Sequence, residues 1–337
     1  MRVLVTGGCG FIGSHFIRLL LERHPDASVV NLDKMTYAAS HENVASVADD
    51  ARYSFMEGDI ADADIARQAV AGCTHVVNFA AESHVDRSIH GAVDFISTDV
   101  LGTYILLEAA HNAGVERFLQ VSTDEVYGSI DSGSFTEEHP LVPSSPYSAS
   151  KAGGDLQALA YMHTHGLPVV ITRGSNTYGP NQYPEKLIPL FITNALDGLA
   201  LPVYGDGRQV RDWIHARDHA SGILTALLSG TPGEVYNVGG GNERENIWIT
   251  HQILESTGAS ADLITHVADR PGHDLRYSLA TGKLRALGWA PEIDFAEGLQ
   301  QTVAWYTDRR DWWEPIKSGE FRAFYEQQYR ERLASRA

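Results

Sequence analysis

The sequence predicts an α/β fold in which a doubly wound parallel sheet is joined to a smaller, interleaved C-terminal lobe. Short apolar runs alternate with helical stretches through about the first two hundred residues. This alternation is typical of parallel strands that helices cover on both faces. After residue 176 the pattern loosens into stretches punctuated by Pro and Gly, which indicates a loop-built second lobe.

The expected strands lie, in order, at residues 3–5, 29–32, 53–56, 75–79, 118–121 and 169–172. Helical patterns lie between them, for example at residues 12–24 and 100–113. One later apolar run, at residues 235–238, is followed by three glycines and is expected to return to the main sheet. The helix over residues 100–113 is apolar nearly all round, whereas covering one sheet face requires only one apolar stripe. Its second face predicts a homodimer, with burial beneath the second lobe as the alternative.

Composition and charge restrict the classes of function. The net charge is −17, from 26 basic and 43 acidic side chains, which disfavours nucleic acid as a partner. A phosphate-bearing substrate would therefore need a few local cations. No apolar run reaches membrane-spanning length, and the chain opens directly into a strand pattern without a charged leader, which favours the cytoplasm. The two cysteines, Cys9 and Cys73, and the scattered histidines predict neither a disulfide nor a metal site.

Three glycines, Gly7, Gly10 and Gly13, join the first expected strand to the first expected helix. Glycine at this spacing permits a tight turn and lets the backbone approach a pyrophosphate, which then meets the helix N-terminus. Asp33 lies twenty residues beyond Gly13, at the end of the second strand. A carboxylate there accepts hydrogen bonds from both ribose hydroxyls and repels a 2′-phosphate. The pattern predicts a Rossmann-type NAD site with Asp59 near the adenine; ordinary turn roles for these residues are the alternative.

The sequence also indicates how the chain is divided into two domains. We expect residues 1–175 to form an NAD-binding Rossmann domain to which residues 235–247 return. Residues 176–234 and 248–330 are then expected to form the substrate-binding lobe.

The chemistry is expected at the carboxyl end of the fifth strand. Tyr147 and Lys151 are spaced i,i+4, on one helix face, so that the ammonium would lower the pKa of the phenol and let it act as a base. Thr123-Asp124-Glu125 directly follows the strand at residues 118–121. The carboxyl ends of strands are where open α/β sheets bind ligands. Surface acids at a strand end are the bland alternative for Asp124 and Glu125.

These residues resemble the extended short-chain dehydrogenase/reductase family, and Thr123-Asp124-Glu125 is similar to the corresponding segment of its dTDP-glucose 4,6-dehydratases. Members that only epimerise at C4 lack the Asp-Glu pair, and UDP-glucuronate decarboxylases carry Ser-Glu there. The resemblance covers nearly the whole chain. It includes Asn176-Thr177-Tyr178-Gly179-Pro180, Arg211-Asp212-Trp213 and the segments 80–88, 184–190, 270–274, 312–313 and 318–320.

The resemblance implies a 4,6-dehydratase that makes dTDP-4-keto-6-deoxyglucose with bound NAD as its cofactor. Tyr147 and Lys151 would assist oxidation at C4, Thr123 would bond the C4 oxygen, Glu125 would remove the C5 proton and Asp124 would protonate the departing C6 hydroxyl. The residues expected to contact NAD are Gly7, Gly10, Phe11, Ile12, Gly13, Asp33, Lys34, Thr36, Asp59, Ile60, Phe79, Ala80, Ala81, Ser83, Thr98, Tyr147, Lys151 and Asn176. Those expected to contact the nucleotide sugar are His84, Thr123, Asn176, Glu185, Lys186, Leu187, Pro202, Tyr204, Arg211, Asn246, Arg270 and His273.

Three positions depart from the family pattern, and they leave alternatives open. Gly174 and Thr177 stand where Cys and a second Asn are common, and Asn181 stands where an aromatic residue is frequent. The nucleotide could therefore be UDP or another in place of dTDP. A nucleotide-sugar epimerase or decarboxylase on the same fold is the second hypothesis. An inactive NAD-binding regulatory protein is the third, and the presence of Tyr147, Lys151 and both acids counts against it.

Overall fold

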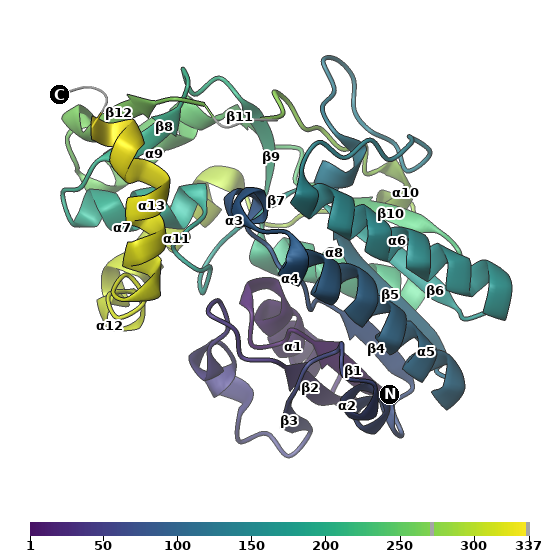
Figure 1. Cartoon of the computed structure of the whole chain (residues 1–337). Coiled ribbons are helices and arrows are strands. Elements are labelled where there is room, and N and C mark those ends of the chain that lie inside the picture. The colour runs from purple at the N-terminus through teal and green to yellow at the C-terminus, as the bar shows by residue number, and fades with distance from the viewer. Residues whose placement is uncertain (270–272, 335–337) are drawn as a thin grey trace.

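Seven parallel strands form the centre of the protein in the computed structural model, which describes residues 1–269 and 273–334 (Figure 1). They lie in the order β10-β6-β5-β4-β1-β2-β3, so the predicted doubly wound sheet is confirmed. The strands are β1 (Arg2–Thr6), β2 (Ser28–Asp33), β3 (Tyr53–Glu57), β4 (His75–Asn78), β5 (Arg117–Thr123), β6 (Val169–Gly174) and β10 (Val235–Val238).

Helices cover both faces of this sheet because successive side chains of each strand point to opposite sides. In β1, Val3 and Val5 join the cluster packed by α1 (Phe11–Arg23) and α8 (Ala216–Ser229), whereas Leu4 joins the opposite cluster. The helices of that opposite face are α2 (Ala63–Val70), α5 (Thr103–Ala113) and α6 (Pro146–His165). The short elements of this part are η1 (His41–Val47), α3 (Val85–His90), α4 (Val93–Phe95), η2 (Ile96–Gly102), η3 (Asp124–Tyr127) and α10 (Gly282–Arg285).

The second lobe has its own core and is richer in helix than the sequence indicated (Figure 1). The expectation of a loop-built lobe is wrong here: α7, for example, is a helix that is apolar and buried along nearly its whole length. The small sheets comprise β7 (Asn176–Tyr178), β9 (Val210–His215) and β11 (Glu243–Glu245), and β8 (Leu201–Tyr204) with β12 (Ile264–Val267). The helical elements are α7 (Leu187–Leu196), α9 (Asn246–Thr257), η4 (Ala261–Leu263), α11 (Phe295–Asp308), α12 (Arg310–Trp313) and α13 (Glu320–Ala334).

The two parts are interleaved along the chain. The strand β10 pairs with β6, as expected for a segment that returns to the main sheet. In addition α8 and α10, from stretches assigned by sequence to the lobe, contribute residues to a core cluster of the main sheet. The domain boundaries given by the sequence therefore remain a proposal.

The helix α6 is defined by its ends and by two glycines. Ser145 caps its N-terminus in a reciprocal capping box with Ser148, and Pro146 fits the first turn. Gly153 and Gly154 weaken its centre but permit a close approach of η2, because a Cβ on Gly154 would lie 2.8 Å from the carbonyl oxygen of Asp99. The helix is thereby held tightly against the segment that precedes α5.

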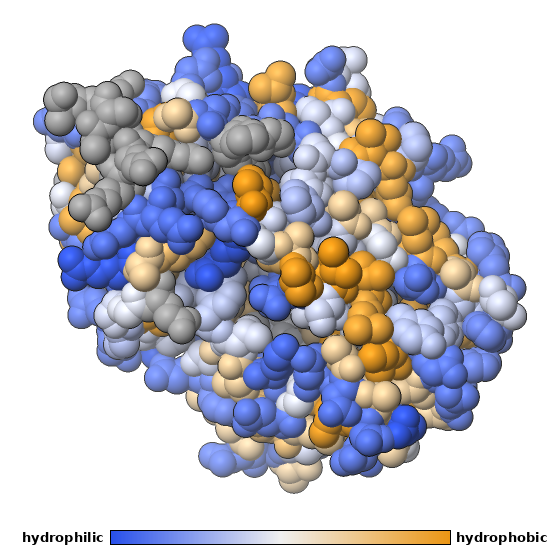
Figure 2. Space-filling view, in the orientation of Figure 1, coloured by the Kyte–Doolittle hydropathy of each residue, from blue (hydrophilic) through white to orange (hydrophobic). Residues whose placement is uncertain are grey.

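Exposed apolar side chains gather on the face formed by α3, α4, η2, α5 and α6, and Figure 2 shows them over α4, α5 and α6. The second face of the helix predicted at residues 100–113 is part of this surface, since Leu101 and Tyr104 are 49% and 43% exposed. It is therefore not buried beneath the second lobe. Within the described ranges, no helix is long and apolar enough to cross a membrane.

An ion pair inside the main domain generates a prediction of stability. Arg173 on β6 bonds Asp155 on α6 at 3.0 Å, and both side chains are at most 4% exposed. Arg173→Ala leaves a buried carboxylate without its cation, which costs about 3–5 kcal/mol of unfolding free energy. Chemical denaturation measures this loss. Arg322→Ala removes the exposed pair with Glu326 and serves as the control; an equal loss in the two variants would contradict the argument.

Candidate active site

The turn between β1 and α1 is built so that only glycine fits. Gly7 has φ of 68°, and a Cβ there would lie 2.8 Å from the amide nitrogen of Ala80. A Cβ on Gly13 would lie 2.4 Å from the carbonyl oxygen of Gly7. Gly10 is the N-cap of α1, with no side-chain cap on the first amides of the helix. The turn thus leaves an open helix N-terminus, which suits a pyrophosphate.

Asp33 closes one side of this turn at the end of β2. Its Oδ2 accepts a hydrogen bond from the amide of Cys9 at 2.8 Å, and its Oδ1 accepts one from the amide of Met35 at 2.9 Å. Burial raises the pKa of Asp33, and these two amides oppose the shift. Each carboxylate oxygen retains a further lone pair, which can accept a ribose hydroxyl. Nearby, Lys34 forms an ion pair with Asp59 at 2.7 Å.

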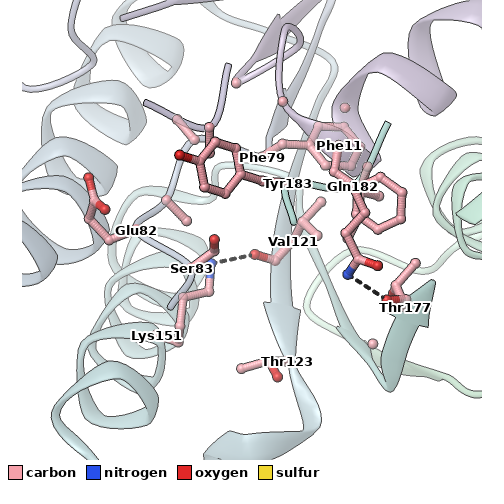
Figure 3. A pocket seen from close by; sticks show the side chains of 18 of the residues that line it. Phe11, Phe79, Glu82, Ser83, Val121, Thr123, Lys151, Thr177, Gln182 and Tyr183 are labelled. Carbon is pink, nitrogen blue, oxygen red and sulfur yellow. Dashed lines mark hydrogen bonds between the residues drawn. The ribbon is translucent and has the colours of Figure 1, made fainter. Parts of the chain in front are cut away.

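A cavity of about 350 Å³ runs from the glycine turn to the carboxyl end of β5, and Figure 3 shows its interior. Every residue that the sequence assigned to NAD lines it, as do Thr123, Asp124 and Glu125. The structure therefore brings together the cradle, the ribose acid and the chemical residues in one space. Their individual roles remain proposals.

The segment Thr123-Asp124-Glu125 changes direction where β5 ends. The Thr123 hydroxyl accepts a hydrogen bond from the Glu125 amide at 3.3 Å, which starts the 3-10 turn η3, and it donates to Asp124 Oδ1 at 3.3 Å. Threonine suits both the strand end and this cap. The turn places Asp124 inward, 2% exposed, and leaves Glu125 half-buried at the cavity wall.

The surroundings of Asp124 favour its neutral form. The pKa of Asp124 is raised well above its usual range, mainly by burial and then by the charges of Glu125 and Asp212. Arg211 and the hydrogen bond with Thr123 act in the opposite direction and lower this pKa. Within the described part of the chain, no group hydrogen-bonds Asp124 Oδ2. A protonated carboxyl can use that oxygen to donate a proton to a ligand. The site therefore holds one carboxylic acid next to a second carboxyl group.

Tyr147 and Lys151 lie on α6, and Tyr147 is within hydrogen-bonding reach of Thr123. The Lys151 ammonium donates to the Val121 carbonyl at 2.9 Å, a bond drawn in Figure 3. The sequence predicted that Lys151 lowers the pKa of Tyr147. In the structure the pKa of Tyr147 is raised well above its usual range, mainly by burial and then by the charges of Glu125 and Asp99. Among the main causes, only a hydrogen bond with Thr123 lowers this pKa. Positive charge from elsewhere is needed to offset them.

A second cavity of about 150 Å³ adjoins the first on the side of the lobe. The predicted substrate residues that line it are His84, Asn176, Glu185, Lys186, Leu187, Pro202, Tyr204, Arg211, Asn246 and His273. Thr123 lines the first cavity instead, and Arg270 lies outside the described residues. The residues that line both cavities are Glu125, Asn176, Glu185, Lys186, Leu187 and Trp213.

Arg211 is fixed within this second cavity by its own protein. Its Nη1 donates to the Val210 carbonyl at 2.8 Å, its Nη2 donates to the Asp274 carbonyl at 2.9 Å, and the guanidinium lies 4.2 Å from the Tyr277 ring centroid. The cation is 5% exposed and cannot reorient freely. It presents a fixed positive charge where an anionic substrate group would enter.

Sequence reasoning missed several lining residues, of which His219 is the most informative. A Cβ on Gly174 would lie 2.3 Å from Cε1 of His219, so the glycine at this departure from the family pattern makes room for the ring. Thr177, a second departure, contacts His219 Nδ1 at 2.7 Å. The two departures are thus coupled to one buried histidine. No sequence signal links these positions, because Gly174 and His219 lie on separate elements.

Comparisons with known proteins agree with this geometry. Residues 4–302 match the model of the GDP-mannose 4,6-dehydratase family. The dTDP-glucose 4,6-dehydratase of Streptomyces niveus is 54% identical over 323 residues, which cover 94% of this chain and 96% of that protein. The dTDP-glucose 4,6-dehydratase 1 of Escherichia coli K12 is 46% identical over an alignment of 358 residues, which covers 98% of this chain and 99% of that protein.

Solved structures resemble the chain over a similar extent. The dTDP-glucose 4,6-dehydratase of Streptomyces venezuelae, with NAD and TYD bound, superimposes with a TM-score of 0.92 at 56% identity, over 94% of this chain and all of that one. The UDP-glucose 4-epimerase of Thermus thermophilus, in complex with NAD, gives a TM-score of 0.85 at 33% identity, over 92% of this chain and all of that one.

The environment of Asp33 predicts how the protein selects its dinucleotide. Asp33→Ala should weaken NAD binding about 10- to 100-fold, since a charge-assisted hydrogen bond is worth about 1.5–3 kcal/mol. It should also relax discrimination against NADP, because the repelling charge is lost. Titration calorimetry with both dinucleotides measures the ratio. Asp33→Asn keeps the side chain's shape and removes the charge together with one of the two oxygens that accept the Cys9 and Met35 amides. An unchanged NAD/NADP ratio in both variants would reassign Asp33 to a structural turn.

Proposed function

The chain belongs to the GDP-mannose 4,6-dehydratase family, and from that membership we propose that it converts dTDP-glucose to dTDP-4-keto-6-deoxyglucose. It is thus an NAD-dependent hydro-lyase of nucleotide-sugar and deoxysugar biosynthesis. The observation that carries this proposal is the acid pair beside Tyr147 in the first cavity, in which burial and the charge of Glu125 raise the pKa of Asp124. Elimination of water needs both an acid and a base, and this site provides two carboxyl groups in different environments.

The cavity fits NAD at its glycine end. The turn at Gly7 and Gly13 has no room for side chains and exposes the N-terminus of α1, and the buried Asp33 faces the same cavity. The chemistry that NAD supplies when bound is reversible hydride acceptance together with the positive charge of its oxidised nicotinamide ring. Because the hydride removed from C4 is later returned to C6, the dinucleotide is regenerated in each turnover.

Tyr147, Lys151 and Thr123 would act at C4 of the sugar. Tyr147 accepts the hydroxyl proton as the C4–H bond breaks, and the Thr123 hydroxyl bonds the C4 oxygen. The Lys151 ammonium, fixed on the Val121 carbonyl, stabilises Tyr147 as the phenolate, which becomes the neutral phenol when it takes the C4 hydroxyl proton. These three residues carry out the redox half of the reaction and need no base at C5.

Glu125 and Asp124 would act at C5 and C6. The C4 ketone acidifies the C5 proton, which Glu125 removes, and the electron pair of the broken C5–H bond forms the C5–C6 double bond. The C6 hydroxyl leaves as water with the proton of Asp124. Hydride then adds to C6 and a proton returns to C5, so the product differs from the substrate by one water molecule. The assignment requires Asp124 to stay protonated, which its burial favours.

The second cavity would hold the nucleoside diphosphate. The fixed cation of Arg211 and the ammonium of Lys186 supply the positive charge that the acidic protein otherwise lacks. Asn176 and Asn246 line the same space and can bond phosphate or base oxygens. The relatives that act on dTDP-glucose, at 46% and 54% identity, support thymidine as the nucleoside.

The compartment and the oligomeric state are part of the proposal. Both cysteines are free and buried, which is compatible with a reducing cytoplasm. The exposed apolar face on α3, α4, η2, α5 and α6 is larger than scattered surface residues explain, and a homodimer would cover it.

Glu125→Gln tests the assigned reaction because it keeps the side chain's shape and removes its basic oxygen. With dTDP-glucose, hydride transfer from C4 should survive and show NADH absorbance. Exchange of solvent deuterium into C5 and product formation should fall about 100- to 10,000-fold. Tyr147→Phe is the control and should show neither signal. Full turnover of Glu125→Gln with normal deuterium incorporation, read by mass spectrometry of the product, would exclude Glu125 as the base.

The apolar face predicts a homodimer in solution. Sedimentation at micromolar concentration should report twice the chain mass. Leu101→Glu combined with Tyr104→Glu should yield a folded monomer, because two charges would be buried at the contact. Leu228→Glu, at an exposed apolar position on α8, is the matched control and should stay dimeric. A wild-type monomer would show that this face does not self-associate.

A further inference from the structure

Asp99 is a buried carboxyl group that the proposed reaction does not use. It lies in η2 and is 2% exposed, directly after Thr98, which lines the first cavity. Burying a carboxyl group is costly unless its oxygens are bonded, so a group of this kind next to a catalytic cavity has a structural or chemical reason.

Both oxygens of Asp99 connect parts of the active site. Oδ2 accepts a hydrogen bond from the Ser150 hydroxyl at 2.6 Å, and Oδ1 accepts one from the Glu82 amide at 3.2 Å. Ser150 lies in the turn of α6 that carries Tyr147 and Lys151. Glu82 lies after β4 in the segment that lines the cavity. Asp99 therefore ties the catalytic turn of α6 to the strand-end loop that borders the NAD site.

The backbone is shaped to bring Asp99 this close. Residues Ile96–Gly102 form a π-helical turn, a wide turn that is often found at functional sites. On the facing helix, a Cβ on Gly154 would lie 2.8 Å from the carbonyl oxygen of Asp99, and one on Gly153 would lie 2.8 Å from Cγ2 of Val100. The two glycines and the π turn together permit the bond between Ser150 and Asp99.

We propose that Asp99 is a positioning residue for Tyr147 and Lys151: it fixes the turn of α6 that carries them and presents a buried negative charge to that pair. The proposal rests on the proposed function in assigning Tyr147 as the base at C4. The charged and titratable groups that interact with Asp99 from the packed elements are Lys151 and Tyr147 on α6 and Glu82 after β4.

The negative charge of Asp99 raises the pKa of Tyr147. Burial raises the pKa of Asp99 to about 6, although Lys151 and the bond from Ser150 lower it. Above that pH the carboxylate is ionised and contributes to the raised pKa of Tyr147. Below it Asp99 is neutral and the contribution disappears. Asp99 thus restrains the ionisation of Tyr147 at neutral pH while it holds the helix turn in place.

Two substitutions separate charge from position. Asp99→Asn can keep both contacts, because its Oδ1 can accept from the Glu82 amide and its Nδ2 can donate to the Ser150 hydroxyl, which in turn can donate to the Tyr147 carbonyl. It removes the charge alone. Asp99→Ala removes both contacts. Asp218→Asn is the matched control, since Asp218 is also buried but bonds only the amides of Glu292 and Ile293, outside both cavities.

The measurement is the pH profile of first-turnover NADH formation by the holoenzyme. In Asp99→Asn the acidic limb should move to lower pH, because Tyr147 ionises more readily, and Asp218→Asn should leave the limb in place. Asp99→Ala should lower kcat about 10- to 100-fold with little change in KM, as expected for a displaced catalytic group. An unshifted limb in Asp99→Asn overturns the role of the charge, and full kcat in Asp99→Ala overturns the positioning role.

Two further measurements test the role of Asp99: the kcat of a Ser150 variant and a titration of Tyr147 without substrate. If Asp99→Ala does not fold, Ser150→Ala removes the same contact from the side of α6 and should also lower kcat; an unchanged kcat overturns positioning. The phenolate absorbance of Tyr147, read as the difference from Tyr147→Phe, titrates without substrate and should shift to lower pH in Asp99→Asn. Failure of the proposed function would appear separately, as absence of a 4-keto-6-deoxy product from wild-type protein.

Discussion

The hydrogen bond from the Lys151 ammonium to the Val121 carbonyl, 2.9 Å long, is the constraint on which the arrangement of the site depends. It fastens α6 to the carboxyl end of β5. Tyr147, one helical turn before Lys151 on α6, then faces Thr123. The two acids that follow Thr123 line the same cavity. On another side of α6, Gly153 and Gly154 let η2 approach the helix closely. A rigid helix and a strand end thus position groups that a loop would hold less accurately.

The electrostatics of the site follow from crowding carboxyl groups where the protein buries them. Burial is the largest cause of the raised pKa of Asp124, and the neighbouring acids Glu125 and Asp212 raise it further. Burial also raises the pKa of Asp212, to about 6. Although the net charge of the protein is −17, two cationic side chains, Arg211 and Lys186, line the second cavity. The acids proposed to transfer protons, Asp124 and Glu125, line the first cavity and are distinct from the acids of the outer surface.

Several elements were predictable because their signals are local. The glycine turn, Asp33 and the helix turn with Tyr147 and Lys151 each depend on spacing within one or two elements, and the structure places all of them around one cavity. The lobe was less predictable, since α7 is apolar nearly all round and buried along most of its length, so that a polar face does not mark it as a helix. The expected lowering of the Tyr147 pKa by Lys151 was wrong, because burial and the charges of Glu125, Asp99 and Asp124 raise that pKa, and burial is invisible in a linear sequence.

The sequence by itself determined the parallel sheet, the dinucleotide turn and the identities of the acid pair, because strand alternation, glycine spacing and short motifs act over neighbouring residues. Only the tertiary structure decided which distant groups meet. It places His219 in the space left by Gly174, brings Asp212 near Asp124, and joins Asp99 to Ser150 through a π turn that no periodicity announces. Those contacts depend on how separate elements pack, and packing is set by the whole core rather than by any single segment.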